Sequence, residues 1–338
     1  MRKPILILFL TVVTIQLVAQ SRYQVDSMVN RYSRAFWSPE KLSRRITKDF
    51  PSDSARARAI YAWITKHVSY DVKKYELLKK RKYVDRLAKQ VRPFNPEIYS
   101  KKAALRTIRL KKGVCADYSN LYKRLATLSG LNCEVVIGFA KTTREDIGKL
   151  PRQMDHAWNV VKIQDEWKLI DATWGAGYLD MEKRKFVSRF NPDFYFTLPE
   201  LFAVHHFPRE KKWLMTSMTD SAFALLPLYH KLDSKIEVLD PASGILEISS
   251  KDDIQFRIET KNDYKWSYTY RKEKRNFPID ASRDGDIVNF KIPASSFRHD
   301  YLTVYCSKNG LATFQVKSKR WIKKPLTGAR KYDLVINN

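Results

Sequence analysis

Three short segments place the strongest constraint on how this chain folds, because each holds one reactive polar side chain in an otherwise apolar setting. They contain Cys115, His156 and Asp171, in that order along the chain. A thiol needs a base to become a good nucleophile, and the base needs an acceptor that fixes its tautomer. A fold that uses all three residues has to bring them to one place.

The segment that begins at Cys115 predicts a helix that ends near Gly130, a residue that commonly terminates helices. Its apolar side chains recur at helical spacing, at Tyr118, Leu121, Tyr122, Leu125 and Leu128. Unpaired N–H groups at a helix start stabilise a thiolate, which favours Cys115 as a nucleophile. Taken alone, Cys115 fits a small packing residue equally well. Cys133 and Cys306 lie in strand-like segments, where we expect packing roles.

The other two residues lie on one predicted β-hairpin, with strands at 156–163 and 167–171 and a turn near Gln164 and Asp165. A turn centred there places Asp171 opposite Trp158. His156 and Asp171 then share one face of the hairpin, diagonally adjacent. A register shift of one residue would separate them. Each residue alone has a structural explanation, as a core histidine and as a cap, but together they favour a functional site.

The first twenty residues differ from the rest. Arg2 and Lys3 precede an apolar run from Ile5 to Val18, and small residues follow before Ser21. This pattern predicts a secretory signal peptide at residues 1–20, and hence an exported protein that is periplasmic, displayed on the cell surface or secreted.

The chain is strongly basic, with a formal net charge of +27. Residues 73–112 contain 15 Lys and Arg against three carboxylates. Such charge favours anionic partners, and for an exported protein these are cell-envelope polymers or a membrane surface rather than nucleic acid. A solvated helical face is an equally good interpretation of this basic stretch.

Beyond Pro227 the pattern changes to short strand-like segments, with Asn309-Gly310 as a hairpin signal. We therefore predict an α+β class with two domains, one at residues 21–226 and an all-β sandwich at 227–338.

The three segments resemble those of the transglutaminase-like superfamily, which has a papain-like core. The resemblance rests on Gly113-Val114-Cys115, His156-Ala157-Trp158-Asn159 and Asp171-Ala172-Thr173-Trp174, together with Trp63-Ile64 and Tyr70-Asp71. His206-Phe207-Pro208 and Trp213-Leu214 resemble the kyphoscoliosis-peptidase-like branch, in which immunoglobulin-like modules follow the core. The resemblance implies that Cys115 is the nucleophile, His156 the general base and acid, and Asp171 the orienting carboxylate.

These observations predict an exported thiol enzyme that transfers acyl groups from protein or peptide amides, as a peptidase or a transglutaminase. No metal or organic cofactor is expected, because the adjacent pair His205-His206 has no supporting cysteine or carboxylate spacing. The alternative is a non-catalytic transglutaminase-like scaffold that binds anionic envelope polymers or protein partners.

Overall fold

The computed structural model describes residues 22–80, 96–180, 183–232, 234–249, 252–273, 275–294 and 299–318. The predicted signal peptide at residues 1–20 and residues 319–338 of the predicted all-β domain lie outside them. Two compact units are present. The first comprises the described residues up to Ala140 together with Pro151–Asp220. The second comprises Lys141–Leu150 and the residues from Ser221 onward, so it includes a loop that the sequence assigned to the first domain.

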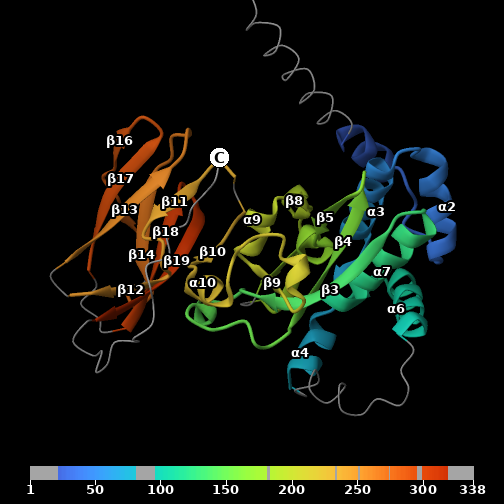
Figure 1. Cartoon of the computed structure of the whole chain (residues 1–338), viewed down its shortest axis with the longest axis horizontal. Helices are drawn as coiled ribbons and strands as arrows, with labels where there is room; N and C mark the ends of the chain where they lie inside the picture. The colour runs from blue at the N-terminus through green and yellow to red at the C-terminus, as the bar shows by residue number, and fades with distance from the viewer. Residues whose placement is uncertain are drawn as a thin grey trace, which may run out of the picture. The chain divides into compact units, whose positions relative to one another are not determined.

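The first unit is an antiparallel sheet with helices packed against it (Figure 1). Its strand order is β8–β5–β4–β3–β9. These strands are β3 (Cys133–Ala140), β4 (His156–Ile163), β5 (Glu166–Ile170), β8 (Tyr195–Thr197) and β9 (His206–Pro208). The longer helices are α2 (Pro39–Asp49), α3 (Asp53–His67), α4 (Val72–Lys80), α6 (Pro96–Leu110) and α7 (Cys115–Leu128).

Short elements complete this unit. They are the parallel pair β1 (Ser69–Tyr70) and β2 (Lys112–Gly113), the hairpin of β6 (Gly177–Asp180) and β7 (Lys185–Ser188), the helices α8 (Ala172–Ala176) and α9 (Pro199–Ala203), and single turns of 3₁₀ helix at Pro192–Phe194 and Lys211–Trp213.

Helix α3 forms the centre of the first core, because it is apolar on nearly every side, and a helix of that kind must be surrounded by protein. Ser52 caps its start by accepting a hydrogen bond from the Ala55 N–H at 3.3 Å. Tyr61 and Trp63 on this helix are completely buried. Gly175 in α8 permits this packing, since a Cβ there would lie 2.0 Å from the Tyr61 hydroxyl oxygen.

The predicted hairpin register is confirmed. Ile163 pairs with Glu166, and the ladder continues to Asn159 opposite Ile170. The two turn residues, Gln164 and Asp165, have φ values of +49° and +66°. Two positive φ values in a two-residue loop are typical of a turn whose twist matches that of the paired strands. This register places the side chains of His156 and Asp171, the residue after β5, on the same face of the sheet.

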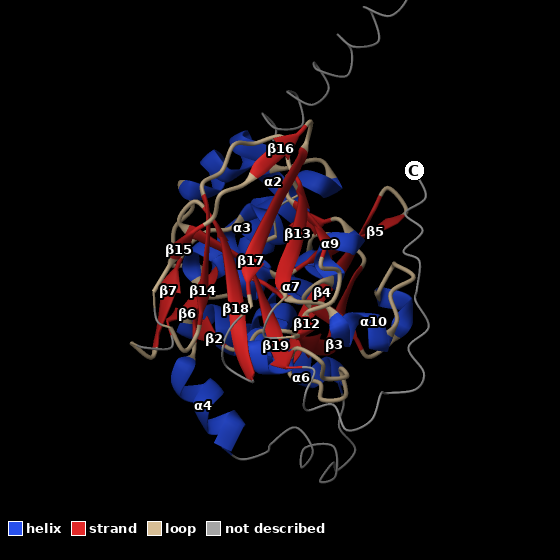
Figure 2. Cartoon of the chain, turned by 90° about the vertical axis from the view of Figure 1, so that its left-hand side faces the viewer, coloured by secondary structure: helices blue, strands red, loops and turns tan. Residues whose placement is uncertain are grey.

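The second unit contains two sheets that share one hydrophobic core. One has the order β10–β19–β18–β14–β15, with β12 parallel to β19, and the other β11–β13–β17–β16. Figure 2 shows β13 and β17 side by side. The strands are β10 (Leu228–Tyr229), β11 (Glu237–Asp240), β12 (Ile245–Ile248), β13 (Asp253–Glu259), β14 (Trp266–Tyr270), β15 (Phe277–Pro278), β16 (Ser282–Asp284), β17 (Ile287–Pro293), β18 (His299–Cys306) and β19 (Asn309–Ser318).

Aromatic rings join the two sheets of this unit. Phe256 of β13 meets Phe314 of β19 edge-on, with ring centroids 5.4 Å apart. The expected α+β class, with a β-rich second half, is confirmed. The second unit also holds α10 (Asp220–Leu225) and a 3₁₀ turn at Arg144–Asp146.

One turn assignment was wrong. The hairpin of β18 and β19 turns at Ser307 and Lys308, because Cys306 already pairs with Asn309 and Tyr305 with Gly310. Ser307 in this turn has a positive φ of +56°. Between the pairs Val304–Ala312 and Tyr305–Gly310 the register shifts by one residue, because Leu311 of β19 is the extra residue of a bulge. Within the described part of the chain, no helix is long and apolar enough to cross a bilayer.

Replacing Gly138 by Ala should destabilise the first unit by roughly 1–3 kcal/mol, since a Cβ at this position of β3 has no space. It would lie 2.2 Å from Cη2 of Trp158 and 2.4 Å from the backbone oxygen of Phe207. Urea unfolding of the full chain measures the change. Gly310→Ala is the control, because its Cβ would meet only the His230 side chain, at 3.0 Å. Equal effects of the two substitutions would contradict the packing argument.

Candidate active site

Cys115 is the first residue of α7 and is partly exposed. The residue before it, Val114, is the N-cap and has no side-chain acceptor for the N–H groups of the first turn. The first N–H groups of a helix have no partner within the helix, so those of Cys115 and Ala116 can stabilise negative charge beside the thiol. The sequence prediction of a cysteine at a helix start is confirmed.

Asp117 holds this helix start in place. Its Oδ2 accepts a hydrogen bond from the Val114 N–H at 2.9 Å. The same carboxylate binds Lys74 Nζ at 2.5 Å and an Arg106 guanidinium nitrogen at 2.7 Å. The two cations offset its negative charge, which would otherwise oppose a thiolate two residues away at Cys115. Gly113 makes room for the arrangement, because a Cβ there would lie 2.5 Å from Cβ of Asp117.

His156 begins β4 and lies close to Asp171, as the hairpin register predicts. Nε2 of His156 is 2.6 Å from Oδ2 of Asp171, and both side chains are buried. The carboxylate is acceptor-only when ionised, so the ring nitrogen donates. That leaves Nδ1 as the nitrogen available to the thiol, and Cys115 is near enough to His156 to contribute to raising the pKa of this histidine. The Cys115 Sγ also lies 3.9 Å from the backbone oxygen of Asp155.

Each carboxylate oxygen of Asp171 has two donors, which fixes the orientation of the group. Oδ1 caps α8 by accepting the N–H groups of Thr173 and Trp174 at 2.8 and 3.1 Å. Oδ2 accepts from His156 and, at 3.1 Å, from Nε2 of His206. The hairpin-end cap and the orienting carboxylate, which the sequence offered as alternatives, are therefore one residue with both roles.

His206 is the residue that the sequence analysis missed. It lies at the start of β9, is 1% exposed, and stacks on Phe202 with ring centroids 3.9 Å apart. The rings of Trp158 and Trp174 enclose it further, at 5.1 and 4.5 Å. The adjacent pair His205-His206 was considered from the sequence only as possible metal ligands. The link of His206 to Asp171 depends on β9 pairing with β3, which no spacing in the sequence indicates.

Electrostatics at the site favour an imidazolium beside a carboxylate. Burial alone lowers the pKa of His156, but the charge and hydrogen bond of Asp171, followed by the contact with Cys115, outweigh it and raise this pKa to about 10. Burial alone raises the pKa of Asp171, but His156 and then His206 hold it well below its usual range. His156 is therefore protonated and Asp171 ionised at neutral pH.

The pKa of His206 is lowered, chiefly by burial and also by the charge of His156, although Asp171 acts to raise it. A neutral imidazole carries one N–H. The ionised Asp171 is a stronger acceptor than the backbone oxygen of Phe202, which lies 3.3 Å from Nδ1, so the proton belongs on Nε2. His206 thus donates to Asp171 without adding a second positive charge.

His156, Asp171 and His206 also form a potential metal-ligand set, with one ligand atom from each within 4.8 Å of the others. The 2.6 Å separation of His156 Nε2 and Asp171 Oδ2 is that of a short hydrogen bond. Two ligand atoms bound tetrahedrally to one zinc ion, each about 2 Å from it, lie about 3.3 Å apart. The arrangement therefore fits a hydrogen-bonded group better than a metal centre.

Comparisons with known proteins agree with this geometry. The family model of the transglutaminase-like superfamily matches residues 40–172, a range that contains Cys115, His156 and Asp171. The chain therefore contains a transglutaminase-like domain. The kyphoscoliosis peptidase of mouse is 31% identical over 193 residues, which are 56% of this chain and 26% of the mouse protein. That of human is 30% identical over 175 residues, 52% of this chain and 24% of the human protein.

A third relative covers more of the chain. The LIM and transglutaminase domain protein ltd-1 of Caenorhabditis elegans is 23% identical over 300 residues, 79% of this chain and 38% of the worm protein. These matches support the kyphoscoliosis-peptidase-like branch of the superfamily. The chain corresponds to only about a quarter of the length of the two kyphoscoliosis peptidases. The catalytic roles of the three residues in this transglutaminase-like domain remain predictions.

Replacing His156 by Gln should slow alkylation of Cys115 by iodoacetamide at neutral pH by at least about tenfold, because the ring no longer takes the thiol proton. Mass spectrometry of the labelled peptides gives the rate. Cys133 and Cys306 are internal controls that should stay unlabelled, since both are buried. Equal labelling rates of Cys115 in the two proteins would show that His156 does not activate the thiol.

Replacing Asp171 by Asn should destabilise the fold most between about pH 5 and 6. Asn keeps an oxygen for the α8 cap and removes the charge. The stabilisation due to the lowered pKa of Asp171 is present above its ordinary value of about 3.9 and is lost as the pH falls further. The stabilisation due to the raised pKa of His156 is complete below about pH 6.5 and is lost as the pH rises toward about 10. Urea unfolding across this range measures the difference, and a constant difference would contradict the assignment.

Proposed function

We propose that the transglutaminase-like domain is a cysteine-dependent enzyme that transfers acyl groups from protein or peptide amides. The observation that carries the proposal is the buried His156, which donates to Asp171 at 2.6 Å and whose pKa is raised by Asp171 and then by the nearby Cys115. This is the order of contacts that a nucleophile, a base and an orienting acceptor require. The names of two relatives, kyphoscoliosis peptidases, agree with such chemistry.

In the acylation step, the thiolate of Cys115 attacks the carbonyl carbon of the amide. The new C–S bond forms as the C=O π electrons move to oxygen. When the oxyanion collapses, the C–N bond breaks and the amine leaves with the proton from Nδ1 of His156. The product on the enzyme is a thioester, and His156 is then neutral and ready to act as a base.

In the second step, the acceptor attacks the thioester carbon while His156 removes its proton. Water as the acceptor yields a carboxylic acid, and a primary amine yields a new amide. In both cases the sulfur leaves as thiolate and His156 becomes the imidazolium again. The geometry serves either reaction, so the acceptor that reaches Cys115 decides between a peptidase and a cross-linking enzyme.

Negative charge on the carbonyl oxygen needs donors in both steps. The uncapped N–H groups at the start of α7 supply them in this proposal, since Val114 has no side-chain acceptor that competes for them. The Asp117 contacts keep this helix start in position.

The charge of the chain supports a second candidate function, a non-catalytic scaffold that binds anionic envelope polymers or protein partners. Lys101, Lys102 and Arg109 lie on an exposed face of α6. Binding to an anionic polymer that weakens steeply with salt, together with Cys115 labelling no faster than that of a free thiol, would favour the scaffold.

Export through residues 1–20 is part of both proposals, and finding Ser21 as the first residue of the protein collected outside the cytoplasm would test it.

Replacing Cys115 by Ala should abolish acyl transfer, a loss of at least about a thousandfold, and leave the fold intact. The assay is mass-spectrometric detection of a peptide acyl adduct on Cys115, followed by its release to water or to an added amine. Cys133→Ala is the matched control, because Cys133 is buried in β3 and its loss should lower stability but not activity. Equal activity of the Cys115→Ala protein and the wild type would overturn the proposal.

A further inference from the structure

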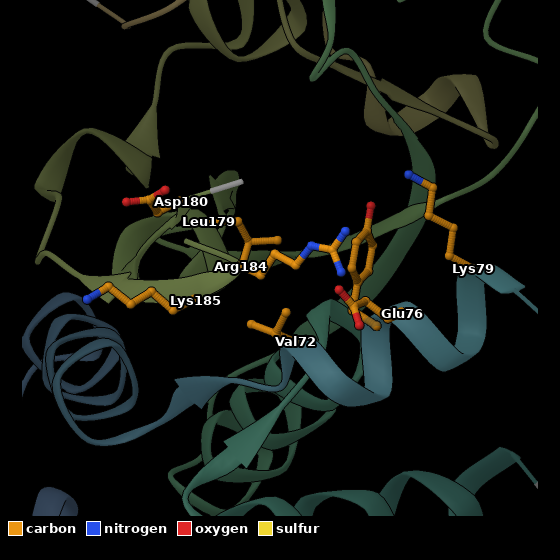
Figure 3. A pocket seen from close by; sticks show the side chains of 8 residues that line it. Val72, Glu76, Lys79, Leu179, Asp180, Arg184 and Lys185 are labelled. Carbon is orange, nitrogen blue, oxygen red and sulfur yellow. The ribbon is translucent and has the colours of Figure 1, made fainter. Parts of the chain in front are cut away.

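A pocket of about 330 Å³ lies in the first unit between α4 and the β6–β7 hairpin (Figure 3). Its apolar surface comes from Val72 and Tyr75 on α4 and from Leu179 on β6. Ligand pockets in proteins range from about 300 to 1,000 Å³. This pocket is at the small end of that range, so it suits one side chain of a larger ligand better than a whole polymer segment.

The pocket is close to the nucleophile. Tyr75 in its wall contacts the ring of Tyr70 with centroids 5.9 Å apart, and Tyr70 lies opposite Gly113, two residues before Cys115. Consecutive Cα atoms are 3.8 Å apart and paired strands about 4.8 Å apart, so the Cα of Val72 lies within about 20 Å of that of Cys115. About six residues of an extended peptide span this distance.

The charges around the pocket favour an anion. Lys79, Arg184 and Lys185 line it, and none of them forms an ion pair with another described residue. Of the two carboxylates, Asp180 is already engaged, with Lys183 Nζ at 3.8 Å and the Lys183 N–H at 2.9 Å. Glu76 is the remaining negative group, and Figure 3 shows the Arg184 side chain extending across from the hairpin toward it.

We propose that this pocket is a substrate subsite that binds an acidic side chain of the peptide, a glutamate or aspartate within about six residues of the residue whose acyl group is transferred. The proposal rests on the proposed function and names its substrate class, an acidic peptide segment. Arg184 and Lys79 would face the ligand carboxylate from the two walls, and the apolar surface would contact its methylene groups.

The test measures binding separately from turnover. The probes are fluorescein-labelled 13-residue peptides with a central Gln and otherwise neutral residues, in which one Glu occupies each position in turn. A matched peptide has Gln in place of that Glu. Anisotropy titrations use full-length protein with Cys115→Ala, so that no peptide is consumed. Turnover of the same peptides by the wild-type protein is measured in parallel.

We expect the best Glu peptide to bind more tightly than its Gln match. Arg184→Gln and Lys79→Gln should each weaken the binding of this Glu peptide about fivefold, and Glu76→Gln should strengthen it. A substitution that damages the fold would weaken binding whichever charge it removes. Opposite effects on affinity of removing a cation and an anion therefore indicate that charge determines binding. Arg189→Gln is the matched control, because Arg189 is exposed, lies one residue after β7 and does not line the pocket.

Equal binding of the Glu and Gln peptides, equal effects of Arg184→Gln and Arg189→Gln, or no measurable binding of any Glu peptide would overturn this subsite. Turnover without preference for Glu would also overturn it and leave the proposed enzyme standing. Binding that depends on Arg184 and Glu76, without turnover of any peptide, would support the subsite and count against the proposed enzyme.

Discussion

The carboxylate of Asp171 is the group on which the site depends. It is completely buried and has four donors, two backbone N–H groups on one oxygen and two histidine rings on the other. An unpaired buried carboxylate would be too costly to keep ionised. Here the donors keep it charged, and its charge in turn keeps His156 protonated. The start of α8, the end of β5 and β9 all meet at this residue, so the fold and the electrostatics of the site are set together.

The helix start at Cys115 has its own support. Asp117 satisfies the backbone there, and two cations from the basic stretch, Lys74 and Arg106, offset its charge. Part of the large positive charge is therefore used to position Cys115 and is not free for partners. Other cations of the same region, including Lys79, line the pocket beside α4. Some cations of the basic stretch thus stabilise the helix start at Cys115. In our proposal, others bind an acidic substrate at the pocket beside α4.

Much of this arrangement was predictable from local patterns. The helix at Cys115, the strands at 133–140 and 156–163, and the hairpin register depend on apolar periodicity and on one turn, which are properties of neighbouring residues. The short strands β15 and β16 were missed, because segments of two or three residues are too short to carry a periodic pattern. The turn of β18 and β19 was misplaced, because Asn309 and Gly310 pair within the ladder and the extra residue Leu311 in β19 shifts the register.

The order of Cys115, His156 and Asp171, and the face that the last two share, follow from residue types and the two-residue period of a strand. The other contacts of the site depend on packing between elements that are distant in the sequence. His206 reaches Asp171 because β9 pairs with β3, some 66 residues apart at the pair formed by Ala140 and His206. Lys74 and Arg106 reach Asp117 because α4 and α6 converge on α7. No residue spacing in the sequence predicts either set of contacts. Contacts between elements that are distant in the sequence depend on how these elements pack in three dimensions.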